Sequence, residues 1–584
     1  MQPNGAFLAW LPVPGVPGDS FAEYRLKASL GDQAVDGVHT IRRPLPPMKL
    51  TSGSAMIDET SMTPRGSWWV REGEAIPISL RATPGAVVRL LLASGDTLAL
   101  VPESPEASGA SAIWVLGRIP TSIRRSSSSR YHGELIAQEP VGRAYLAPTL
   151  NPMAAGASFD DWYCSPAVDS LAIHDGENLP AEPSEIPDGC AVVEVATRVD
   201  TTRVPLPLDI WIQSDRPVIE LHEQPSAAGR DGFVVGRAAR DATTLWMWVP
   251  GMRARVTGRR DGSVRLALDH QTEAWVALDE TVWLHGLTLP ARARVETVRF
   301  KGFTDRLHAQ VFLPHPVPYQ VEIDGNHLTL ILYGAYSNTD WLRYGANDPF
   351  LRSVSWQQAS SDRYLLHIEL AERPWGYRVR YDSGSLSLEI RKPPTIDERK
   401  PLKGRVIAVD PGHPPAGSTG PTRLYEAEAN LAVASRLKRM LEEHGATVIM
   451  TRTDSGAVRL YDRTRHAEMM DAEILVSIHN NALPDGVNPF ENNGTSVFYF
   501  HPGSSDLAQA LQRNLLMAMG LRDLGIGRAS LALARPTWMP AVLTEGAFMM
   551  IPEQEAALRN AQFQEAYARG VLEGIREYLR ERSE

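Results

Sequence analysis

Four side chains that can bind a metal or move a proton stand where predicted strands end or a predicted helix begins. His413, His479 and Glu545 each follow a short apolar segment that predicts a buried strand, and Glu426 stands just before a predicted helix. Functional groups in open α/β sheets gather at the carboxyl ends of the strands. We therefore expect these four side chains to converge at one edge of a sheet.

Two imidazoles and one carboxylate are a common ligand set for catalytic zinc, and they leave a fourth position open for water. Zinc at such a site lowers the pKa of water and polarises a carbonyl group. A second glutamate, not bound to the metal, can then take the water proton and deliver it to a leaving nitrogen. Either histidine alone is more often structural, and the spacing is not the HExxH of zinc endopeptidases. The joint placement of the four residues therefore carries the prediction.

The segment from residue 404 onward alternates strand and helix patterns, which predicts a three-layer α/β domain around a largely parallel sheet. Strands are predicted over 406–409, 447–451, 474–478, 496–500 and 541–544. Helices are predicted over 430–444 and 461–470, and apolar residues spaced by four predict two more near 507–519 and 563–575.

Four motifs in this domain resemble, in order, those of the N-acetylmuramoyl-L-alanine amidases with the AmiA/AmiB/AmiC type of catalytic domain. They are VIAVDPGH at 406–413, EAEANLA at 426–432, SIHNNA at 477–482 and MPAVLTEG at 539–546, with TRTD at 451–454. The resemblance covers about residues 404–582. It implies a zinc enzyme that hydrolyses the amide between N-acetylmuramic acid and L-alanine, with the glycan strands and stem peptides of peptidoglycan as its substrate.

Carried over residue by residue, the resemblance implies His413, Glu426 and His479 as ligands of one Zn²⁺ and Glu545 as the catalytic carboxylate. Glu428 is a nearby alternative to Glu426. Asn430 follows the ligand by four residues in the family, and this register selects Glu426.

Three further residues near the motifs are candidates for supporting roles. Asp410 could hold the second ring nitrogen of a ligand histidine, and Asn480 could face the substrate. Arg452, like Arg463, could orient a carboxylate or contact an acidic group of the substrate, although an ordinary salt bridge is the more common role for such a residue.

Two departures from the family concern the rim of the site. Pro414 and Pro415 follow the first histidine where the family usually has glycines, and 548–552 is apolar where the family often has a turn ending in asparagine. Between the third motif and the next strand only 483–494 intervenes, with loop-forming residues, so we expect no inhibitory helical insertion. The activity of the implied enzyme could instead be regulated by the β-rich region or by an envelope activator protein.

The composition excludes some classes of function. The chain has 584 residues, 43% of them hydrophobic, and a net charge of −10, which opposes a nucleic-acid or anionic-membrane binder. No apolar run reaches the length of a transmembrane helix, and the N-terminus lacks the features of a signal peptide. A periplasmic or extracellular location therefore follows from the implied substrate and not from a visible signal.

Short alternating segments separated by turn residues predict β-rich modules before the α/β domain. We divide the chain into an irregular N-terminal segment with one short helix over 21–30, a β-sandwich, a loop-rich connector, an SH3-like β-rich region, a second β-sandwich, a Pro-rich charged linker and the α/β domain. Their bounds, in that order, are 1–54, 55–148, 149–184, 185–292, 293–393, 394–403 and 404–584. The second sandwich faintly resembles wall-targeting modules. Cys164 and Cys190 could pair in an oxidising compartment or be separate thiols.

Two other functions remain open at this stage. A related zinc peptidase could cut the stem peptide, because the same zinc and glutamate serve any amide. A non-catalytic envelope-binding protein could use the α/β domain as a scaffold. The intact set of His413, Glu426, His479 and Glu545 argues against that last interpretation.

Overall fold

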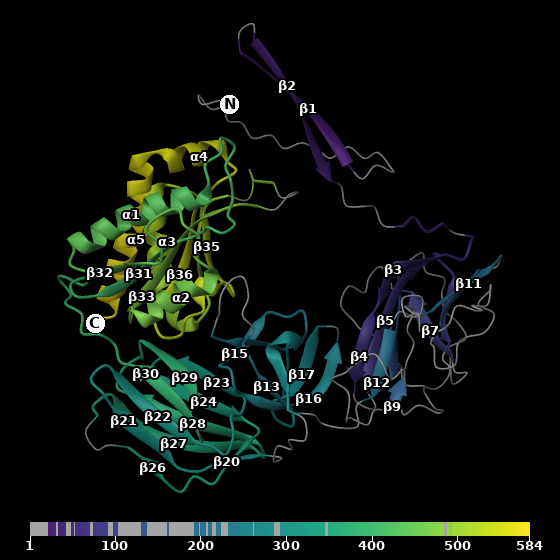
Figure 1. The fold of residues 1–584 in the computed structure, drawn as a ribbon, viewed down its shortest axis with the longest axis horizontal. Coiled ribbons are helices and arrows are strands. Elements are labelled where there is room, and N and C mark those ends of the chain that lie inside the picture. Colours follow the sequence, from purple (N-terminus) through teal and green to yellow (C-terminus); the bar gives the residue numbers. More distant parts are fainter. Residues whose placement is uncertain are drawn as a thin grey trace. The chain divides into compact units, whose positions relative to one another are not determined.

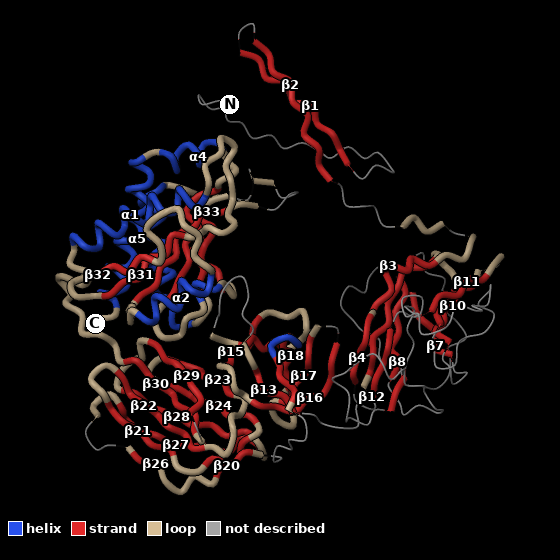
Figure 2. The backbone as a smooth tube through the Cα atoms, in the orientation of Figure 1, coloured by secondary structure: helices blue, strands red, loops and turns tan. Residues whose placement is uncertain are grey.

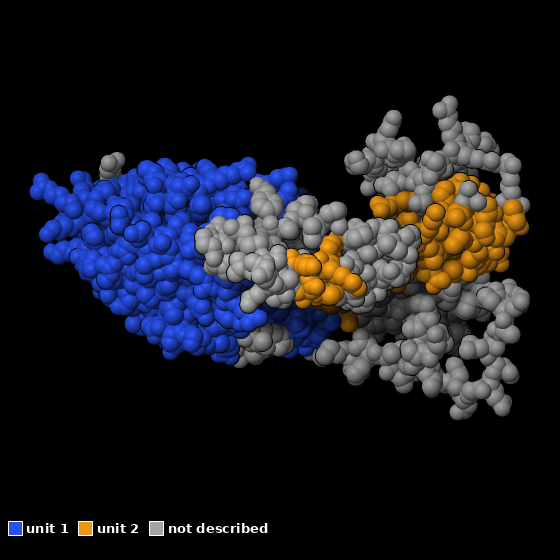
Figure 3. Space-filling model, turned by 90° about the horizontal axis from the view of Figure 1, so that it is seen from above, with its two compact units in different colours: residues 1–10, 217–255, 266–584 blue, residues 11–216, 256–265 orange. Residues whose placement is uncertain are grey.

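The computed structural model divides the chain into two compact units, which Figure 1 and Figure 2 draw as ribbon and tube. One holds residues 217–255 and 266–584, and the other holds residues 11–216 and 256–265 (Figure 3). The structure describes residues 21–30, 33–42, 48–51, 53–70, 74–91, 97–102, 130–136, 160–162, 192–197, 199–205, 208–212, 218–223, 232–260, 262–284, 292–344, 348–382, 384–483, 488–489, 491 and 493–583. Cys164 and Cys190 lie outside these residues.

The smaller unit begins with a two-stranded antiparallel sheet of β1 (Phe21–Leu30) and β2 (Gln33–Arg42). The helix predicted over 21–30 is therefore wrong. Each of the ten residues of β1 pairs with a residue of β2. The residue pattern of 21–30 reflects only a local preference for helix. Pairing with β2 overrides that preference.

A seven-stranded sheet follows in the same unit, with the order β11-β10-β6-β7-β8-β5-β3. Its strands are β3 (Ile57–Thr63), β5 (Ala75–Ala82), β6 (Val87–Leu91), β7 (Thr97–Pro102), β8 (Arg130–Ile136), β10 (Val192–Ala196) and β11 (Thr201–Pro205). Alternating side chains of β5, β6 and β10 form its apolar core. Because β10 pairs with β6, this sheet extends beyond the predicted module boundary at residue 148. Beside it, β4 (Gly66–Val70) pairs with β12 (Leu208–Ile212), which pairs with β9 (Asp160–Trp162).

The larger unit starts with short antiparallel strands. β13 (Val218–Leu221) pairs with β19 (Thr281–Trp283), and β14 (Val234–Arg237) pairs with both β15 (Thr244–Trp248) and β18 (Glu273–Ala277). The strands β16 (Arg253–Arg260) and β17 (Ser263–Ala267) are divided between the two units. Trp248 is fully buried and donates to the carbonyl of Tyr319 at 2.8 Å. The SH3-like assignment of this region stays a prediction.

Residues 293–391 form two larger β-sheets. The first has the order β26-β21-β22-β30-β29, with β21 (Val298–Gly302), β22 (Arg306–Phe312), β26 (Leu342–Arg343), β29 (Gly376–Asp382) and β30 (Ser385–Arg391). The second has the order β23-β24-β28-β27, with β23 (Tyr319–Asp324), β24 (His327–Tyr333), β27 (Leu351–Ser360) and β28 (Arg363–Leu370). Every second residue of β22, β24 and β28 is buried, so each sheet has one apolar face. A short pair, β20 (Ala293–Val295) and β25 (Ala335–Ser337), completes this β-module.

The segment predicted as a linker, 394–403, packs against the domain that follows. Ile396 contacts the main apolar core of the α/β domain, and Leu402 is buried within that core. The side chain of Asp397 accepts hydrogen bonds from the backbone of Arg399 and Lys400. The prolines and charges that suggested an extended spacer therefore belong to a docked segment.

The α/β domain is built on a six-stranded sheet with the order β32-β31-β33-β36-β34-β35. Its strands are β31 (Val406–Pro411), β32 (Thr447–Met450), β33 (Ile474–Asn481), β34 (Thr495–Tyr499), β35 (Asp523–Arg528) and β36 (Ala541–Phe548). All neighbours are parallel except β34 and β36. The predicted α/β architecture is confirmed, although β35 was not predicted.

Helices cover both faces of this sheet (Figure 1). α1 (Glu426–Glu443), α3 (Ser505–Met519) and α5 (Ala561–Glu581) pack on one face through a core that includes Leu437, Leu511 and Val571. α2 (Leu460–Met469) and the short helix η4 (Ala532–Ala534) contribute to a second core around Trp538. α4 (Pro552–Arg559), which precedes α5, was not predicted. Among the described residues, no helix combines the length and apolarity needed to cross a membrane.

The β-module and the α/β domain meet at a packed joint centred on Trp538, which is 1% exposed. The guanidinium of Arg378 lies over its ring at 4.2 Å, and its indole N–H donates to Asp471 at 2.8 Å. The indole N–H of Trp375 donates to the carbonyl of Glu473 at 2.6 Å. Burial of the aromatic rings and the cation–π contact both stabilise the packing of the β-module against the α/β domain.

Candidate metal centre and active site

The strand register brings the candidate residues to one edge of the sheet. Pro411 at the end of β31 lies beside Ile478, and His479 of β33 lies beside Glu545 of β36. Glu426 is the first residue of α1, four residues earlier than the predicted helix start. The carboxyl ends of three parallel strands and the start of one helix therefore meet, as expected for this fold class.

His413, Glu426 and His479 converge. The Nε2 atom of His413 lies 3.3 Å from one carboxylate oxygen of Glu426, and the Nδ1 atom of His479 lies 3.1 Å from the other. The ligand atoms of all three lie within 4.8 Å of one another, and in the described part of the chain they are the one group of three such side chains that could hold a metal ion.

Glu426 is held in place by several donors. It is 3% exposed, and it accepts hydrogen bonds from the backbone of Ser418 at 3.0 Å and of Asn480 at 3.2 Å. Burial alone would raise the pKa of Glu426, but hydrogen bonds from His413 and His479 outweigh it and hold that pKa well below its usual range. The carboxylate is therefore ionised, which is the state that binds a cation.

The two histidines are oriented by their surroundings. The Nδ1 atom of His413 lies 3.2 Å from the carbonyl of Pro415, which leaves its Nε2 atom directed at Glu426. The ring of His479 packs against Gly412, where an added Cβ would lie 2.2 Å from Nε2. Any larger residue at 412 would displace the ring, so this glycine lets the Nδ1 atom of His479 lie against Glu426.

Asp410 does not bind a histidine, so this part of its predicted role is wrong. It is fully buried and accepts hydrogen bonds from Arg463 at 2.8 Å, from Ser477 at 2.5 Å and from Thr451. Burial raises the pKa of Asp410, but the charge of Arg463 and the two hydroxyls lower it more, so the net shift is downward. Among the described residues, the donors to Asp410 are an arginine and two hydroxyls and not an imidazole.

Arg463 connects Asp410 to the loop that carries His413. Its guanidinium donates to the carbonyls of Pro411 at 2.8 Å, His413 at 3.1 Å and Pro414 at 2.7 Å. His413 has φ of 57°, a left-handed conformation that is uncommon for a residue with a side chain. The bonds from Arg463 help to keep the loop in this unfavourable conformation.

The side chains of Arg452 and Asn480 are buried and make hydrogen bonds inside the α/β domain. Arg452 is 5% exposed and donates to the carbonyls of Pro411, Gly412, Ala427 and Asp454. Asn480 is 2% exposed. Its amide donates to the side chain of Asn430 at 2.9 Å and accepts from the backbone of Ala547 at 3.1 Å. A role facing the substrate was suggested for Asn480, and either a carboxylate-orienting or a substrate-contacting role was suggested for Arg452; the structure shows both side chains hydrogen-bonded within the domain.

Glu545 lies beside His413, Glu426 and His479 but does not belong to that group of three. Its side chain is mostly buried, and its Oε2 atom has no hydrogen-bond partner among the described residues. Burial, assisted by the negative charge of Glu426, raises the pKa of Glu545 to about 8. A buried carboxyl with a pKa near neutrality is suited to accept and return a proton.

Tyr567 supports this edge and was not identified from the sequence. Its hydroxyl donates to the carbonyl of His479 at 2.9 Å and contacts the hydroxyl of Thr544 at 2.7 Å. The ring lies so close to Gly546 that an added Cβ would be 2.1 Å from it. The four-residue spacing of apolar residues in α5 indicated only that Tyr567 lies in the core. The sequence around Tyr567 does not show that its hydroxyl reaches the end of β33.

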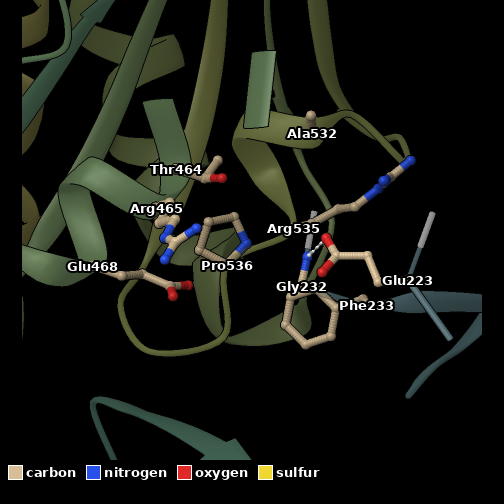
Figure 4. A pocket seen from close by; sticks show the side chains of 9 residues that line it. All are labelled: Glu223, Gly232, Phe233, Thr464, Arg465, Glu468, Ala532, Arg535 and Pro536. Carbon is tan, nitrogen blue, oxygen red and sulfur yellow. Dashed lines mark hydrogen bonds between the residues drawn. The ribbon is translucent and has the colours of Figure 1, made fainter. Parts of the chain in front are cut away.

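A separate pocket of about 340 Å³ lies on the α2 side of the larger unit (Figure 4). Arg465 and Glu468 of α2 line it together with Arg535, Phe233 and Glu223. None of the four candidate site residues lines this pocket, so it is distinct from the metal centre.

The fold and the three converging side chains define a domain of the α/β class with a candidate metal-binding site at its strand ends. Residues 407–577 match the model of the family described as N-acetylmuramoyl-L-alanine amidase. The probable cell wall amidase LytH of Staphylococcus epidermidis is 31% identical over 183 residues, which cover 31% of this chain and 60% of that protein. LytH of Staphylococcus aureus is 30% identical over 186 residues, which cover 31% and 61%. The chain thus spans about three fifths of the length of these curated relatives.

Two solved structures are similar to the same part of the chain. An N-acetylmuramoyl-L-alanine amidase from Clostridium difficile 630 is 32% identical with a TM-score of 0.29, covering 30% of this chain and 97% of that one. The catalytic domain of the amidase CwlV from Bacillus (Paenibacillus) polymyxa var. colistinus is 34% identical with a TM-score of 0.28, covering 30% and 98%. Residues 407–577 of the α/β domain match the N-acetylmuramoyl-L-alanine amidase family model, which confirms the resemblance found in its motifs.

Proposed function

We propose that the α/β domain hydrolyses the amide bond between N-acetylmuramic acid and L-alanine in peptidoglycan, with one Zn²⁺ held by His413, Glu426 and His479. The observation that carries this proposal is the convergence of the three donors beside Glu545 in a domain of the amidase family. The names of the curated relatives, probable cell wall amidases, support the same class of substrate.

The donor set fits zinc. Two imidazoles and one carboxylate are a frequent set for catalytic zinc, and donors on one tetrahedral ion are about 3.4 Å apart. The N–O separations of 3.3 and 3.1 Å around Glu426 are close to that value. When bound, zinc supplies a Lewis acid that polarises the substrate carbonyl and lowers the pKa of water.

Glu545 is proposed to move the proton. In the metal-free site its pKa is raised to about 8, and a nearby cation would favour its ionised form. The ionised carboxylate takes a proton from the attacking water and returns it to the nitrogen that leaves with L-alanine. Its Oε2 atom, which has no partner among the described residues, is available for this transfer.

The test is digestion of purified peptidoglycan with the full chain loaded with zinc, followed by mass spectrometry of the released fragments. The proposal expects stem peptides with an unmodified N-terminal L-alanine. Glu545→Gln keeps the shape of the side chain and removes its basic oxygen, so release should stop while zinc stays bound. Glu428→Gln is the matched control, because Glu428 is exposed two residues after the proposed ligand, and its activity should be unchanged.

Other outcomes would replace the proposal. Shorter peptides without a free N-terminal L-alanine would identify a peptidase acting on the stem peptide. No release by a zinc-loaded wild-type chain would identify a non-catalytic envelope-binding protein. Activity that survives both Glu545→Gln and removal of the metal by a chelator would contradict the assigned roles.

We also propose that the protein acts in the cell envelope, in the periplasm or outside the cell, and that the β-module of residues 293–393 binds the wall. Exposed aromatic side chains support wall binding: Trp341 is 58% and Tyr344 is 53% exposed. Such rings can pack on sugar faces. Retention of the full chain on purified sacculi should fall in a Trp341→Ala, Tyr344→Ala double variant, and unchanged retention would argue against this role. An envelope activator stays a prediction.

A further inference from the structure

The outward face of the four-stranded sheet in the β-module carries two histidines that the proposed hydrolysis does not use. Leu328, Leu330 and the alternate residues of β28 point into the core, so the intervening residues point outward. On this face His327 lies opposite Glu369, and Thr329 lies opposite His367. Side chains that are directly paired on one face of a sheet lie close enough to interact with each other.

The two imidazoles face each other through one ring nitrogen each, and both nitrogens also contact the hydroxyl of Thr329. The Nε2 atom of His327 lies 3.3 Å from the Nδ1 atom of His367, and the ring centroids are 5.3 Å apart. The hydroxyl of Thr329 lies 3.0 Å from the first nitrogen and 3.3 Å from the second. Two nitrogens and one oxygen therefore lie within 3.3 Å of one another on the outward face of the sheet.

Glu369 determines which nitrogen of His327 is available. Its Oε1 atom lies 2.5 Å from Nδ1 of His327, so the proton of a neutral imidazole is held there and Nε2 carries the lone pair. A carboxylate that binds the far nitrogen of an imidazole is the usual outer partner of a metal-ligating histidine, and it also increases the basicity of the ligand.

The separation of the nitrogens favours a shared ion over a direct hydrogen bond. Hydrogen bonds between nitrogen and an acceptor are commonest near 2.9–3.0 Å, and 3.3 Å is long for one. Two nitrogens bound to one tetrahedral zinc ion at about 2.0–2.1 Å are separated by about 3.4 Å. The observed 3.3 Å matches the second arrangement more closely.

We propose that His327 and His367 form a second zinc-binding site, in the β-module and separate from the amidase centre. Nε2 of His327 and Nδ1 of His367 bind the ion, Glu369 orients His327, and water completes the coordination. The position is open to solvent, since the side chains of His327 and Glu369 are 34% and 43% exposed. Imidazole nitrogens suit zinc, copper and nickel ions, and the open face admits the ion without movement of the backbone.

The experiment counts zinc bound by the full chain at neutral pH after removal of all metal and equilibrium dialysis. We expect two equivalents in the wild type and one in His479→Ala, which lacks a ligand of the amidase centre. In that background, His327→Ala or His367→Ala should remove the remaining equivalent. Glu369→Gln should weaken its binding by about 10–100-fold, the usual effect of losing an outer partner of a ligand.

His308→Ala in the His479→Ala background is the matched control. His308 also pairs with a polar side chain, Ser387, on a β-strand of the module, but it has no second imidazole beside it. Its removal should leave one equivalent bound. All variants change partly exposed side chains, and circular dichroism verifies that each is folded.

Two results would overturn this proposal: no zinc bound by folded His479→Ala, or an equivalent that survives loss of both His327 and His367. Neither outcome bears on amidase activity, because the digestion assay depends on Glu545 and the other metal centre. Conversely, the wild-type chain could prove inactive in the digestion assay while His367→Ala still binds one equivalent of zinc fewer than the wild type. The proposed function would then fail and the second zinc site would stand.

Discussion

Asp410→Asn tests whether the buried ion pair with Arg463 holds the edge of the sheet that carries the metal centre. The side chains of Asp410 and Arg463 are 0% and 3% exposed, and their atoms are 2.8 Å apart. The substitution keeps the shape and removes the charge, so the guanidinium stays buried without its counter-ion. Loss of one partner of a buried pair costs about 3–5 kcal/mol.

That cost should appear as faster local opening of β31 and β33, which the pair joins through Ser477. Since about 1.4 kcal/mol corresponds to a tenfold change in an equilibrium constant, hydrogen-exchange protection of these strands should fall by more than about 100-fold. Mass spectrometry of the metal-free full chain measures this by peptide. Zinc affinity should fall too, because Arg463 also holds the carbonyls of His413 and Pro414.

Asp462→Asn is the matched control, on the helix α2 that also carries Arg463. Asp462 pairs with Arg459 on the surface, where the two side chains are 34% and 62% exposed. Surface pairs of this kind contribute about 0–1 kcal/mol, so protection should change by less than about fivefold. If Asp410→Asn reduces protection no more than Asp462→Asn does, the reasoning about the buried pair is wrong.

Three further predictions follow from the same structure. In the metal-free protein the pKa of Glu545 is raised to about 8 from 4.5, so the folded state keeps a proton that the unfolded state loses. Stability to thermal unfolding should therefore decrease as the pH rises from about 4.5 to 8, and Glu545→Gln should abolish this decrease. Glu426→Gln should lower zinc affinity by more than about 100-fold, beyond the effect of an outer partner, whereas Glu428→Gln should leave calorimetric titrations unchanged. Trp538→Ala should destabilise the joint by about 3–5 kcal/mol in denaturant unfolding, whereas exposed Trp341→Ala should change stability by less than about 0.5 kcal/mol.

The convergence of the candidate residues was predictable because it depends on a rule of topology. In a parallel sheet, residues that follow strands lie at one edge whatever the details of packing. His413, His479 and Glu545 met this condition, and they lie as expected. Glu426 was also placed correctly in space, although it begins α1 instead of preceding it.

The supporting residues were not predictable in the same way. An ordinary salt bridge was the more common role expected for Arg452 and Arg463, but both are buried and donate to several carbonyls of the loops around the site. Which carbonyl a long side chain reaches depends on the packing of segments distant in sequence. The strand β1 shows the same limit, because its partner β2 determines its conformation and its own residue pattern does not.

Helix α2 links the joint with the β-module to the metal centre. Near its start, Arg463 holds the carbonyls of His413 and Pro414. Just beyond its end, Arg391 of the β-module donates to the carbonyls of Ala472 at 2.6 Å and Asp471 at 3.0 Å. A helix of ten residues is about 15 Å long and is stiff over that length. The described residues of the β-module therefore connect through α2 to the loop that carries a proposed zinc ligand.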